Sequence, residues 1–356
     1  MMLITGDIFI GNLKISYDDD VKRLFDSSTY LLSNFENVLQ SSSLAMREDK
    51  VSNLQFSPEA FWNFFSSMSI EPILTLANNH IHDLGIKGIE NTLEFLQTSR
   101  IRHFGVGLAE RVIVPYVFTY ADKKIALFAC SSNDPEVMSI KADSKNVGVL
   151  DIYDPRLLQA INSAKLTSDY VIVLPHWGIE FINYPAIIQR KLAYGWIDAG
   201  ADLVVGHHPH IIQGKEVYNS KSIYYSLGNF IFPNMFNKRG VLNKWRKENS
   251  RSIVIKLNFD QNGNPLISEH GLFFNTNTNS LSFSNESIKQ FIEKSEFLRI
   301  EKYDFRKYYN IFNDDIYRYQ RQRRSILNKV TAFYPKHKSM SRFKYFLYRL
   351  SRKLLN

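Results

Sequence analysis

Cysteine is almost absent from this chain, which has a single residue of this type among 356. One cysteine cannot form an intramolecular disulfide, so the fold depends on packing alone. Cys130 lies in the apolar segment IALFAC and has no basic neighbour in the sequence that would lower its pKa. We therefore interpret Cys130 as a core residue and not as a nucleophile.

The sequence also lacks an uninterrupted apolar segment of about 18 residues, the length that a transmembrane helix requires. The first residues, MMLITGDIFIGN, show no basic leader followed by a long apolar segment, which a signal peptide would need. We therefore expect a cytoplasmic protein. Peripheral contact with the inner face of the membrane is compatible with this expectation.

An excess of charge of one sign is missing from most of the chain. The formal net charge is +9, and residues 301–356 contribute +11 of it, so residues 1–300 are close to neutral at −2. A nucleic-acid-binding body would carry a basic excess of its own. We therefore expect no nucleic-acid partner.

Short apolar segments with strand character alternate with longer segments of helical periodicity, which is the pattern of a layered α/β domain. The expected strands cover residues 3–4, 30–32, 73–75, 124–130, 170–174, 203–205 and 222–225. The expected helices cover residues 57–68, 88–99, 155–166 and 185–199. A hairpin with its turn at Asn262-Gly263 follows. We place a boundary at 283, between a domain of residues 1–283 and a basic, aromatic-rich helical extension of residues 284–356.

Polar residues that commonly bind metals follow five of the expected strands, where the loops at the carboxyl ends of an α/β sheet form its binding crevice. They are Asp7, Glu36, Asn78, Asn79, His80, His176, His207, His208 and His210. A single histidine after a strand is more often a hydrogen-bonded loop residue than a ligand. The repetition at successive strand ends favours a shared metal site.

Mixed oxygen and imidazole donors suit Mn²⁺, Fe²⁺ or Zn²⁺ better than Ca²⁺ or Mg²⁺, which prefer oxygen alone. In the segment His208-Pro209-His210 we expect an extended backbone, stiffened by proline, that places both imidazoles on one face. The sequence therefore predicts a divalent-metal site that includes this pair.

Six motifs occur in a fixed order over about residues 3–233: GDIFIG, NFE, LANNHIHDLG, PHWGIE, GADLVVGHHPHIIQG and YSLGNFIF. Together they resemble the CapA family of bacterial poly-γ-glutamate capsule-synthesis proteins, within the calcineurin-like metallophosphoesterase superfamily. The resemblance implies an α/β sandwich of two mixed β-sheets flanked by helices, with the metal site at their shared edge.

The resemblance also implies roles for individual residues. Asp7 and His210 would bind a first metal, and Glu36 would bridge two metals. Asn79, His176 and His208 would bind the second metal, and His80 would assist the leaving group from outside the metals.

One departure from the superfamily pattern concerns the first metal. The usual opening Asp-x-His reads Asp7-Ile8-Phe9 here, so a ligand is missing and the number of ions, one or two, stays open. His207 or a water molecule is a possible substitute for the missing histidine.

Further residues near these motifs are candidates for the surroundings of the site. We expect Asp83 to orient His80 or His82 as part of the catalytic apparatus. The candidates for substrate binding are Asn78, Trp177, Glu180, His207 and Asn229. Helix capping and core packing are equally good explanations for these residues.

Two functions fit these residues. The first is a metal-dependent phosphoester hydrolase in the biosynthesis of a capsule or exopolymer, poly-γ-glutamate or polysaccharide. The second is a non-catalytic module that uses the same metal-lined crevice to bind an anionic polymer or the capsule-synthesis machinery, because a shared fold does not transmit chemistry.

The C-terminal segment RFKYFLYRLSRKLLN has apolar residues at helical spacing, interleaved with lysine and arginine. The apolar residues are Phe343, Phe346, Leu347, Leu350 and Leu354. The pattern predicts a basic amphipathic helix, which lies on an anionic membrane surface or packs on the body or another subunit.

Overall fold

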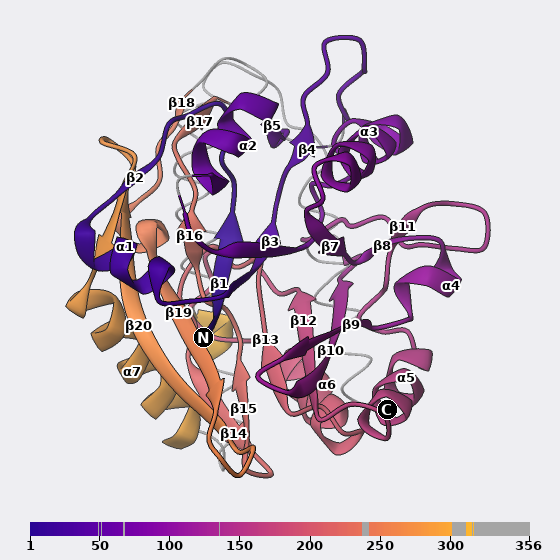
Figure 1. Ribbon diagram of the computed structural model, residues 1–356, viewed down its shortest axis with the longest axis vertical. Coiled ribbons are helices and arrows are strands. Elements are labelled where there is room, and N and C mark those ends of the chain that lie inside the picture. The colour runs from indigo at the N-terminus through magenta and orange to yellow at the C-terminus, as the bar shows by residue number, and fades with distance from the viewer. Residues whose placement is uncertain are drawn as a thin grey trace.

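The computed structural model describes residues 1–48, 50, 52–66, 68–134, 136–236, 242–300, 311–314 and 316. In this part of the chain, a nine-stranded mixed sheet has the order β2-β21-β20-β19-β1-β3-β6-β7, with β16 also paired to β1 (Figure 1). Its strands are β1 (Met2–Ile8), β2 (Ser16–Tyr17), β3 (Tyr30–Phe35), β6 (Glu71–Thr75), β7 (Arg102–Phe104), β16 (Asn229–Ile231), β19 (Arg251–Phe259), β20 (Pro265–Asn275) and β21 (Ser280–Phe283). The strands β1, β3, β6 and β7 run parallel, whereas β19, β20 and β21 pair in antiparallel fashion.

The second large sheet of the described residues has six strands in the order β14-β15-β13-β12-β10-β9. These are β9 (Tyr116–Tyr120), β10 (Lys123–Ser131), β12 (Tyr170–His176), β13 (Leu203–Val205), β14 (Lys215–Tyr218) and β15 (Lys221–Tyr224). Its four central strands are parallel and its two edge strands antiparallel. Every strand expected from the sequence is therefore present, and both sheets are mixed.

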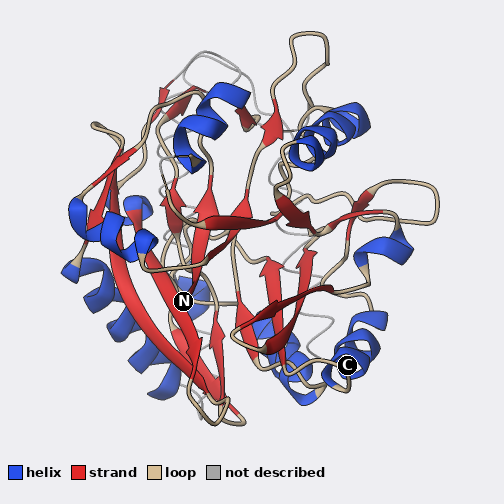
Figure 2. Ribbon diagram, viewed as in Figure 1, coloured by secondary structure: helices blue, strands red, loops and turns tan. Residues whose placement is uncertain are grey.

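Shorter strand pairs and the helices complete the fold. The pairs are β4 (Val38–Leu39) with β5 (Gln55–Phe56), β8 (Val106–Gly107) with β11 (Gly148–Val149), and β17 (Met235–Phe236) with β18 (Leu242–Asn243). The helices are α1 (Asp19–Asp26), α2 (Pro58–Phe65), α3 (Gly85–Thr98), α4 (Ala109–Val112), α5 (Arg156–Lys165), α6 (Ile187–Asp198), the 3₁₀ helix η1 (Lys247–Ser250) and α7 (Asn285–Ile300). Figure 2 shows helices around the outside of the strands.

Side chains that alternate along the strands sort the core into three layers. Ile4 of β1 and Ile125 of β10 point into the core between the two sheets. Their neighbours Leu3 and Ala126 point outward, Leu3 towards the core that includes α1, α2 and α3, and Ala126 towards that of α5 and α6. The result is a sandwich of two sheets with helices on both outer faces, as expected from the sequence.

Local signals place the helix ends and the hairpin. Ser57 caps α2 by accepting a hydrogen bond from the backbone of Ala60, and proline occupies the first turn. The turn between β19 and β20 contains Gly263 with φ of +81°, which glycine adopts without strain. Cys130 is fully buried and burial raises its pKa, so it is a core residue as predicted.

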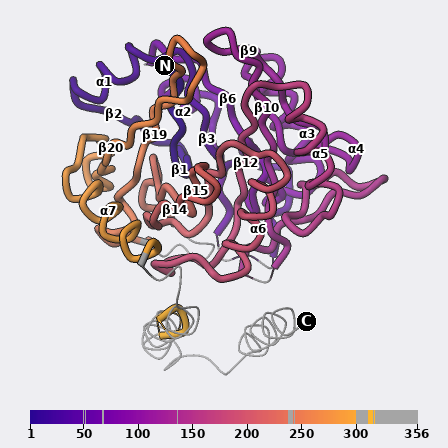
Figure 3. The backbone as a smooth tube through the Cα atoms, turned by 90° about the horizontal axis from the view of Figure 1, so that it is seen from below, coloured from indigo at the N-terminus to yellow at the C-terminus, as the bar shows by residue number. Residues whose placement is uncertain are grey.

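The helix expected from residue 284 begins at Asn285 as α7, which lies against β14, β19 and β20 (Figure 3). Lys294 of α7 donates hydrogen bonds to Ile212 O at 2.6 Å and to Asn183 Oδ1 at 2.8 Å. Among the described residues, no helix combines the length and apolar character that crossing a membrane requires. The amphipathic segment 342–354 lies outside the described residues, and the boundary at 283 stays a prediction.

Candidate metal centre

The centre forms where β1, β3, β6, β12 and β13 end. At its end β1 lies between β3 and β16, and the pairing sets Asp7 opposite Asn34 on one side and Asn229 on the other. This approach requires Gly6, because a Cβ at that position would lie 1.8 Å from Gly228 O. On the second sheet, His176 at the end of β12 pairs with His207.

Six buried residues that the sequence marked as metal ligands come together here: Asp7, Glu36, Asn79, His176, His208 and His210. Two groups of three have ligand atoms within 4.8 Å of one another, Glu36 with His176 and His208, and Asp7 with Glu36 and His210. Asn79 Oδ1 lies 3.0 Å from His176 Nε2 and so joins the first group. Glu36 belongs to both groups, so its carboxylate is within reach of the ligand atoms of each.

The carboxylate of Glu36 is fully buried, and neither of its oxygens has a hydrogen-bond partner among the described residues. Oε1 lies 3.6 Å from His176 Nε2 and 4.0 Å from His210 Nε2. His208 Nε2 also has no partner there. Buried polar atoms in this state are costly unless a ligand satisfies them, and a divalent cation satisfies a carboxylate and an imidazole together.

Burial also sets the protonation of these groups. It lowers the pKa of His176 and His208 well below the ordinary value, so both imidazoles are neutral and have a lone pair for a cation. Burial raises the pKa of Glu36 well above its ordinary value, and the nearby charge of Asp7 adds to this rise. A bound cation would reverse the penalty on both carboxylates, so the donor set fits a divalent ion.

The backbone conformation at His208 and His210 differs from the one expected. The two residues have φ of +96° and +55°, so the extended backbone expected from the sequence is wrong. Both imidazoles still face the same centre, with their ring centroids 5.8 Å apart. Non-glycine residues in this region are strained and concentrate at functional sites. His210 Nδ1 lies 2.8 Å from Asn229 Oδ1, and Asn249 Nδ2 donates to His210 O at 3.0 Å, so neighbouring amides hold the strained turn.

His80 lies at the edge of the centre, 12% exposed, on the turn that follows β6. Asn78 shapes this turn because its Oδ1 accepts the backbone N–H groups of His80 and Ile81 at 3.0 and 3.1 Å. His80 Nδ1 lies 2.6 Å from Asp83 Oδ2, and Nε2 lies 3.7 Å from Glu36 Oε1. The ring therefore lies between Asp83 and the candidate metal ligands. Burial lowers the pKa of His80 to about 4, although Asp83 opposes this change.

Some candidates for substrate binding do not reach the centre. Trp177 is fully buried, stacks on Trp196 at 5.3 Å and donates to Tyr225 O at 3.0 Å, so it is a core residue with no surface for a ligand. His207 Nε2 lies 3.1 Å from Thr5 O, which keeps this imidazole away from the ligand atoms. Glu180 is half-buried and close enough for its charge to raise the pKa of Glu36.

Phe9 packs in an aromatic cluster beside the centre and brings no ligand atom. Its ring centroid lies 5.3 Å from that of Phe232, which in turn lies 4.9 Å from the His210 ring and 5.2 Å from Trp245. The group of Asp7, Glu36 and His210 therefore has three protein donors. The group of Glu36, His176 and His208 has a fourth donor in Asn79.

Three residues at the centre carried no signal that sequence reasoning used. Asn34 Nδ2 donates to Asp7 Oδ1 at 2.7 Å and lies 3.2 Å from His176 Nδ1, thereby joining the two sheets. Asn249 supports His210, and Lys50 is buried beside Asp83. Asn34 stands two residues before Glu36 on the same strand-end motif, so its position was the available signal.

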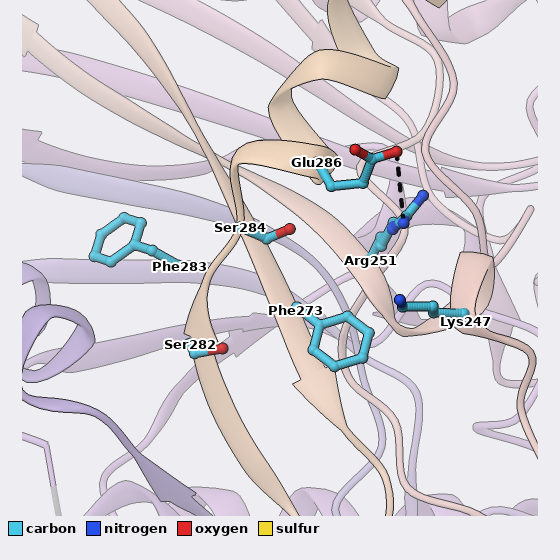
Figure 4. Close-up of a pocket in the computed structure, with 7 residues that line it drawn as sticks. All are labelled: Lys247, Arg251, Phe273, Ser282, Phe283, Ser284 and Glu286. Atoms are coloured by element: carbon cyan, nitrogen blue, oxygen red, sulfur yellow. Dashed lines mark ion pairs between the residues drawn. The ribbon is translucent and has the colours of Figure 1, made fainter.

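A separate cavity of about 570 Å³ lies near the start of α7, lined by Lys247, Arg251, Phe273, Ser282, Phe283, Ser284 and Glu286 (Figure 4). Arg251 lies 3.7 Å from Glu286 Oε1, so its charge is partly balanced within the cavity. None of the six residues of the metal centre lines it.

The fold and the site together define the class of the chain, a two-sheet α/β sandwich with buried histidines and carboxylates gathered at its strand ends. Comparison with known proteins identifies the family. The family described as "Bacterial capsule synthesis protein PGA_cap" matches residues 6–234, and the chain belongs to this family. The match agrees with the range 3–233 expected from the motifs.

Two curated relatives have similar sequences. The PGA biosynthesis protein CapA of Bacillus subtilis is 34% identical over 220 residues, 60% of this chain and 55% of the relative. The capsule biosynthesis protein CapA of Bacillus anthracis is 31% identical over 246 residues, 65% of this chain and 59% of the relative. The chain thus spans somewhat more than half of the length of these relatives.

Solved structures resemble the chain more distantly. A 5'-nucleotidase from Candida albicans aligns with a TM-score of 0.42 and 15% identity, over 78% of this chain and 52% of that one. A phosphatase from Mycoplasma pneumoniae aligns with a TM-score of 0.41 and 8% identity, over 79% and 89%. We therefore base the site on the contacts within this chain.

Proposed function

We propose that this chain is a divalent-metal-dependent phosphoester hydrolase that serves the biosynthesis of a bacterial capsule or exopolymer. The position of Glu36 carries the proposal, because a single buried carboxylate belongs to both groups of ligand atoms. Two ions about 3.5–4 Å apart are the arrangement that favours in-line displacement at phosphorus. The family relationship supports the capsule pathway, since two curated relatives are described as capsule or PGA biosynthesis proteins.

A divalent ion at this centre would supply hydroxide at neutral pH by lowering the pKa of a water molecule, and would neutralise charge on a phosphoryl oxygen. Asp7, Glu36, Asn79, His176, His208 and His210 would hold the ions. The residues Asn34 and Asn229 would fix the orientation of Asp7 and His210 through the hydrogen bonds described above.

His80 would handle the proton of the leaving group. Its Nε2 faces the ligand atoms, and an anionic phosphoryl group beside it would favour the protonated ring. The bond between phosphorus and the leaving oxygen then breaks as the water oxygen bonds to phosphorus. The proton on Nε2 passes to the leaving oxygen, and the proton released by the attacking water replaces it through solvent.

The identity of the ions and the substrate belongs to the proposal as well. The three imidazoles favour Mn²⁺, Fe²⁺ or Zn²⁺, and the substrate would be a phosphoester or an anionic polymer of the capsule. We propose a cytoplasmic location, with residues 342–354 as a peripheral membrane contact. Deletion of residues 334–356 should then abolish co-sedimentation with anionic vesicles, and unchanged sedimentation would contradict the contact.

A phosphoester panel assayed with Mn²⁺, Fe²⁺ or Zn²⁺ tests the hydrolase. We expect turnover in the wild type and a loss of at least about 100-fold in His208→Ala, because a ligand matters more than its hydrogen-bond partners. His270→Ala, on β20 and away from the centre, is the matched control and should keep full activity. Equal metal content and equal activity in His208→Ala and wild type would contradict the proposal.

A second function is favoured by Phe9, which leaves one group of ligands with three protein donors. A centre with a single ion can bind a carboxylate-rich polymer without cleaving it. On this alternative the metal-loaded chain retains poly-γ-glutamate in equilibrium dialysis and hydrolyses no member of the panel. Turnover of any phosphoester that requires His208 would exclude it.

A further inference from the structure

Lys50 is a buried lysine at the edge of the metal centre, and no motif of the sequence pointed to it. It belongs to the loop between β4 and β5, and its side chain is 3% exposed. Burying an ammonium group is costly unless it is paired and hydrogen-bonded. The contacts of Lys50 therefore indicate what holds it in this position.

The first contact of Lys50 is with Asp83, whose carboxylate is fully buried. Lys50 Nζ lies 3.7 Å from Asp83 Oδ1. The other oxygen, Oδ2, accepts the backbone N–H of Leu54 at 2.7 Å and lies 2.6 Å from His80 Nδ1. Asp83 Oδ1 has no hydrogen-bond partner among the described residues, so the ion pair with Lys50 is the contact that balances this side of the carboxylate. The hydrogen bonds to Oδ2 and this ion pair together favour one orientation of the carboxylate and of the His80 ring.

The second contact is with Asn79, which directly precedes His80 and is a ligand of the proposed centre. Lys50 Nζ donates a hydrogen bond to the carbonyl oxygen of Asn79. One ammonium group therefore touches both ends of the short segment from Asn79 to Asp83. This segment carries a metal ligand and the proton-handling ring together, and His80 Nε2 faces Glu36 at 3.7 Å.

We propose that Lys50 is a positioning residue of the centre, which fixes the His80 ring towards the ligand atoms through Asp83 and the Asn79 carbonyl. The proposal rests on the hydrolase function, because the orientation of His80 matters to the reaction only if His80 moves a proton to a leaving group. The simpler alternative is that Lys50 anchors its loop, as the contact of Leu54 with the same carboxylate also does.

The dependence on the leaving group separates positioning from anchoring. We compare Lys50→Met with wild type on phenyl phosphate and 4-nitrophenyl phosphate, with the metal content of each protein measured. Phenolate is a strong base and needs a proton, so its kcat should fall by about 10–100-fold, as for other partners of functional groups. The weak base 4-nitrophenolate leaves without a proton, so its kcat should change by less than about threefold, and KM should be unchanged for both.

An equal fall of kcat for both esters would overturn the proposal and indicate that Lys50 anchors its loop. An unchanged kcat for both esters would overturn it as well, because Lys50 would then be dispensable. Lys87→Met is the matched control, since Lys87 is an exposed lysine of α3 that pairs with Glu90 at 3.0 Å. If Lys50→Met fails to fold, Lys50→Gln replaces it, because glutamine keeps a donor for the Asn79 carbonyl without the charge. Lys50→Gln should also lower kcat for phenyl phosphate more than for 4-nitrophenyl phosphate.

Nitrogen-15 NMR of histidine rings tests Lys50 without any turnover. In the full-length metal-free wild type, His80 should show one tautomer with its proton on Nδ1, towards Asp83. In the Lys50 variant we expect a mixture of tautomers, whereas retention of the single tautomer would overturn the proposal. If the wild type hydrolyses no phosphoester of the panel, these two esters included, the hydrolase function fails, and the ring tautomers still decide the role of Lys50.

Discussion

Two buried carboxylates of this molecule, Glu36 and Glu216, differ in their hydrogen-bond partners. Glu216 on β14 receives hydrogen bonds from Arg190 at 2.8 and 3.1 Å, from Tyr194 at 2.5 Å and from Tyr225 at 2.7 Å. Glu36 at the end of β3 has no hydrogen-bond partner for either oxygen among the described residues. Both carboxylates are almost completely inaccessible to solvent.

The difference separates a structural site from a ligand site. The chain itself supplies a cation and hydrogen-bond donors to Glu216, so this carboxylate needs no ligand from solution. Around Glu36 lie imidazoles that burial keeps neutral and carboxylates that repel it, and the charge of Lys50 offsets only part of this repulsion without a hydrogen bond to Glu36. A carboxylate left in this state is explained by a cation that binds from solution.

Removing the charge of Glu36 should have the largest effect on metal binding. Loss of a residue that only supports a metal ligand weakens binding by about 10–100-fold. Glu36→Gln removes a donor from both groups, so we expect it to weaken metal binding by a factor on the order of 10⁴. The metal-free variant should be at least as stable as the metal-free wild type, because it no longer buries an acidic group that has no hydrogen-bond partner in the described part of the chain. Titration calorimetry with Mn²⁺ and thermal unfolding in chelator check these two results.

Removing the charge of Glu216 should have the opposite outcome. Glu216→Gln leaves Arg190 buried beside a neutral amide, so the free energy of unfolding should fall by about 3–5 kcal/mol. Metal content should not change. Urea unfolding and elemental analysis measure the two quantities, and loss of metal without loss of stability would reverse the assignment of the two sites.

The buried imidazole of His207 should make the stability of the metal-free protein depend on pH. Burial lowers the pKa of His207 from 6.5 to about 4, so its contribution is complete above pH 6.5 and is lost as the pH falls towards 4. The loss is on the order of 3 kcal/mol for a difference of this size. Urea unfolding of wild type and His207→Gln across this range should show a shallower slope in the variant, and equal slopes would contradict the prediction.

Removing the support of a single ligand should have the smallest effect. Asn229 holds His210 Nδ1 at 2.8 Å, and Asn229→Ala should weaken metal binding by about 10–100-fold without abolishing it. Asn264→Ala, in the exposed turn between β19 and β20, is a matched control that should bind metal as the wild type does. A complete loss of metal in Asn229→Ala would contradict this prediction, because Asn229 would then be essential for metal binding.

Much of this arrangement was predictable because strand ends and motifs are local in sequence. The apolar segments before Asp7, Asn79 and His176 gave the strands, and parallel strands deliver their final residues to one edge. The positive φ values of His208 and His210 were not predictable, because tertiary contacts such as that of Asn229 impose them.

Residues whose partners are distant in sequence were left open or missed. For Trp177 the sequence allowed substrate binding and core packing equally, and stacking on Trp196 of α6 supports packing. Lys50 gave no signal because its loop has no periodic pattern, and its partner Asp83 is 33 positions away. Such pairings depend on how the loops fold over the sheet, which local propensities do not determine.

The metal content of the purified protein tests the central claim most directly. After saturation with Mn²⁺ or Zn²⁺ and removal of free ions, elemental analysis should find one or two ions per wild-type chain and almost none in Glu36→Gln. The same amount of metal in both proteins, or none in the wild type, would contradict a metal centre at Glu36.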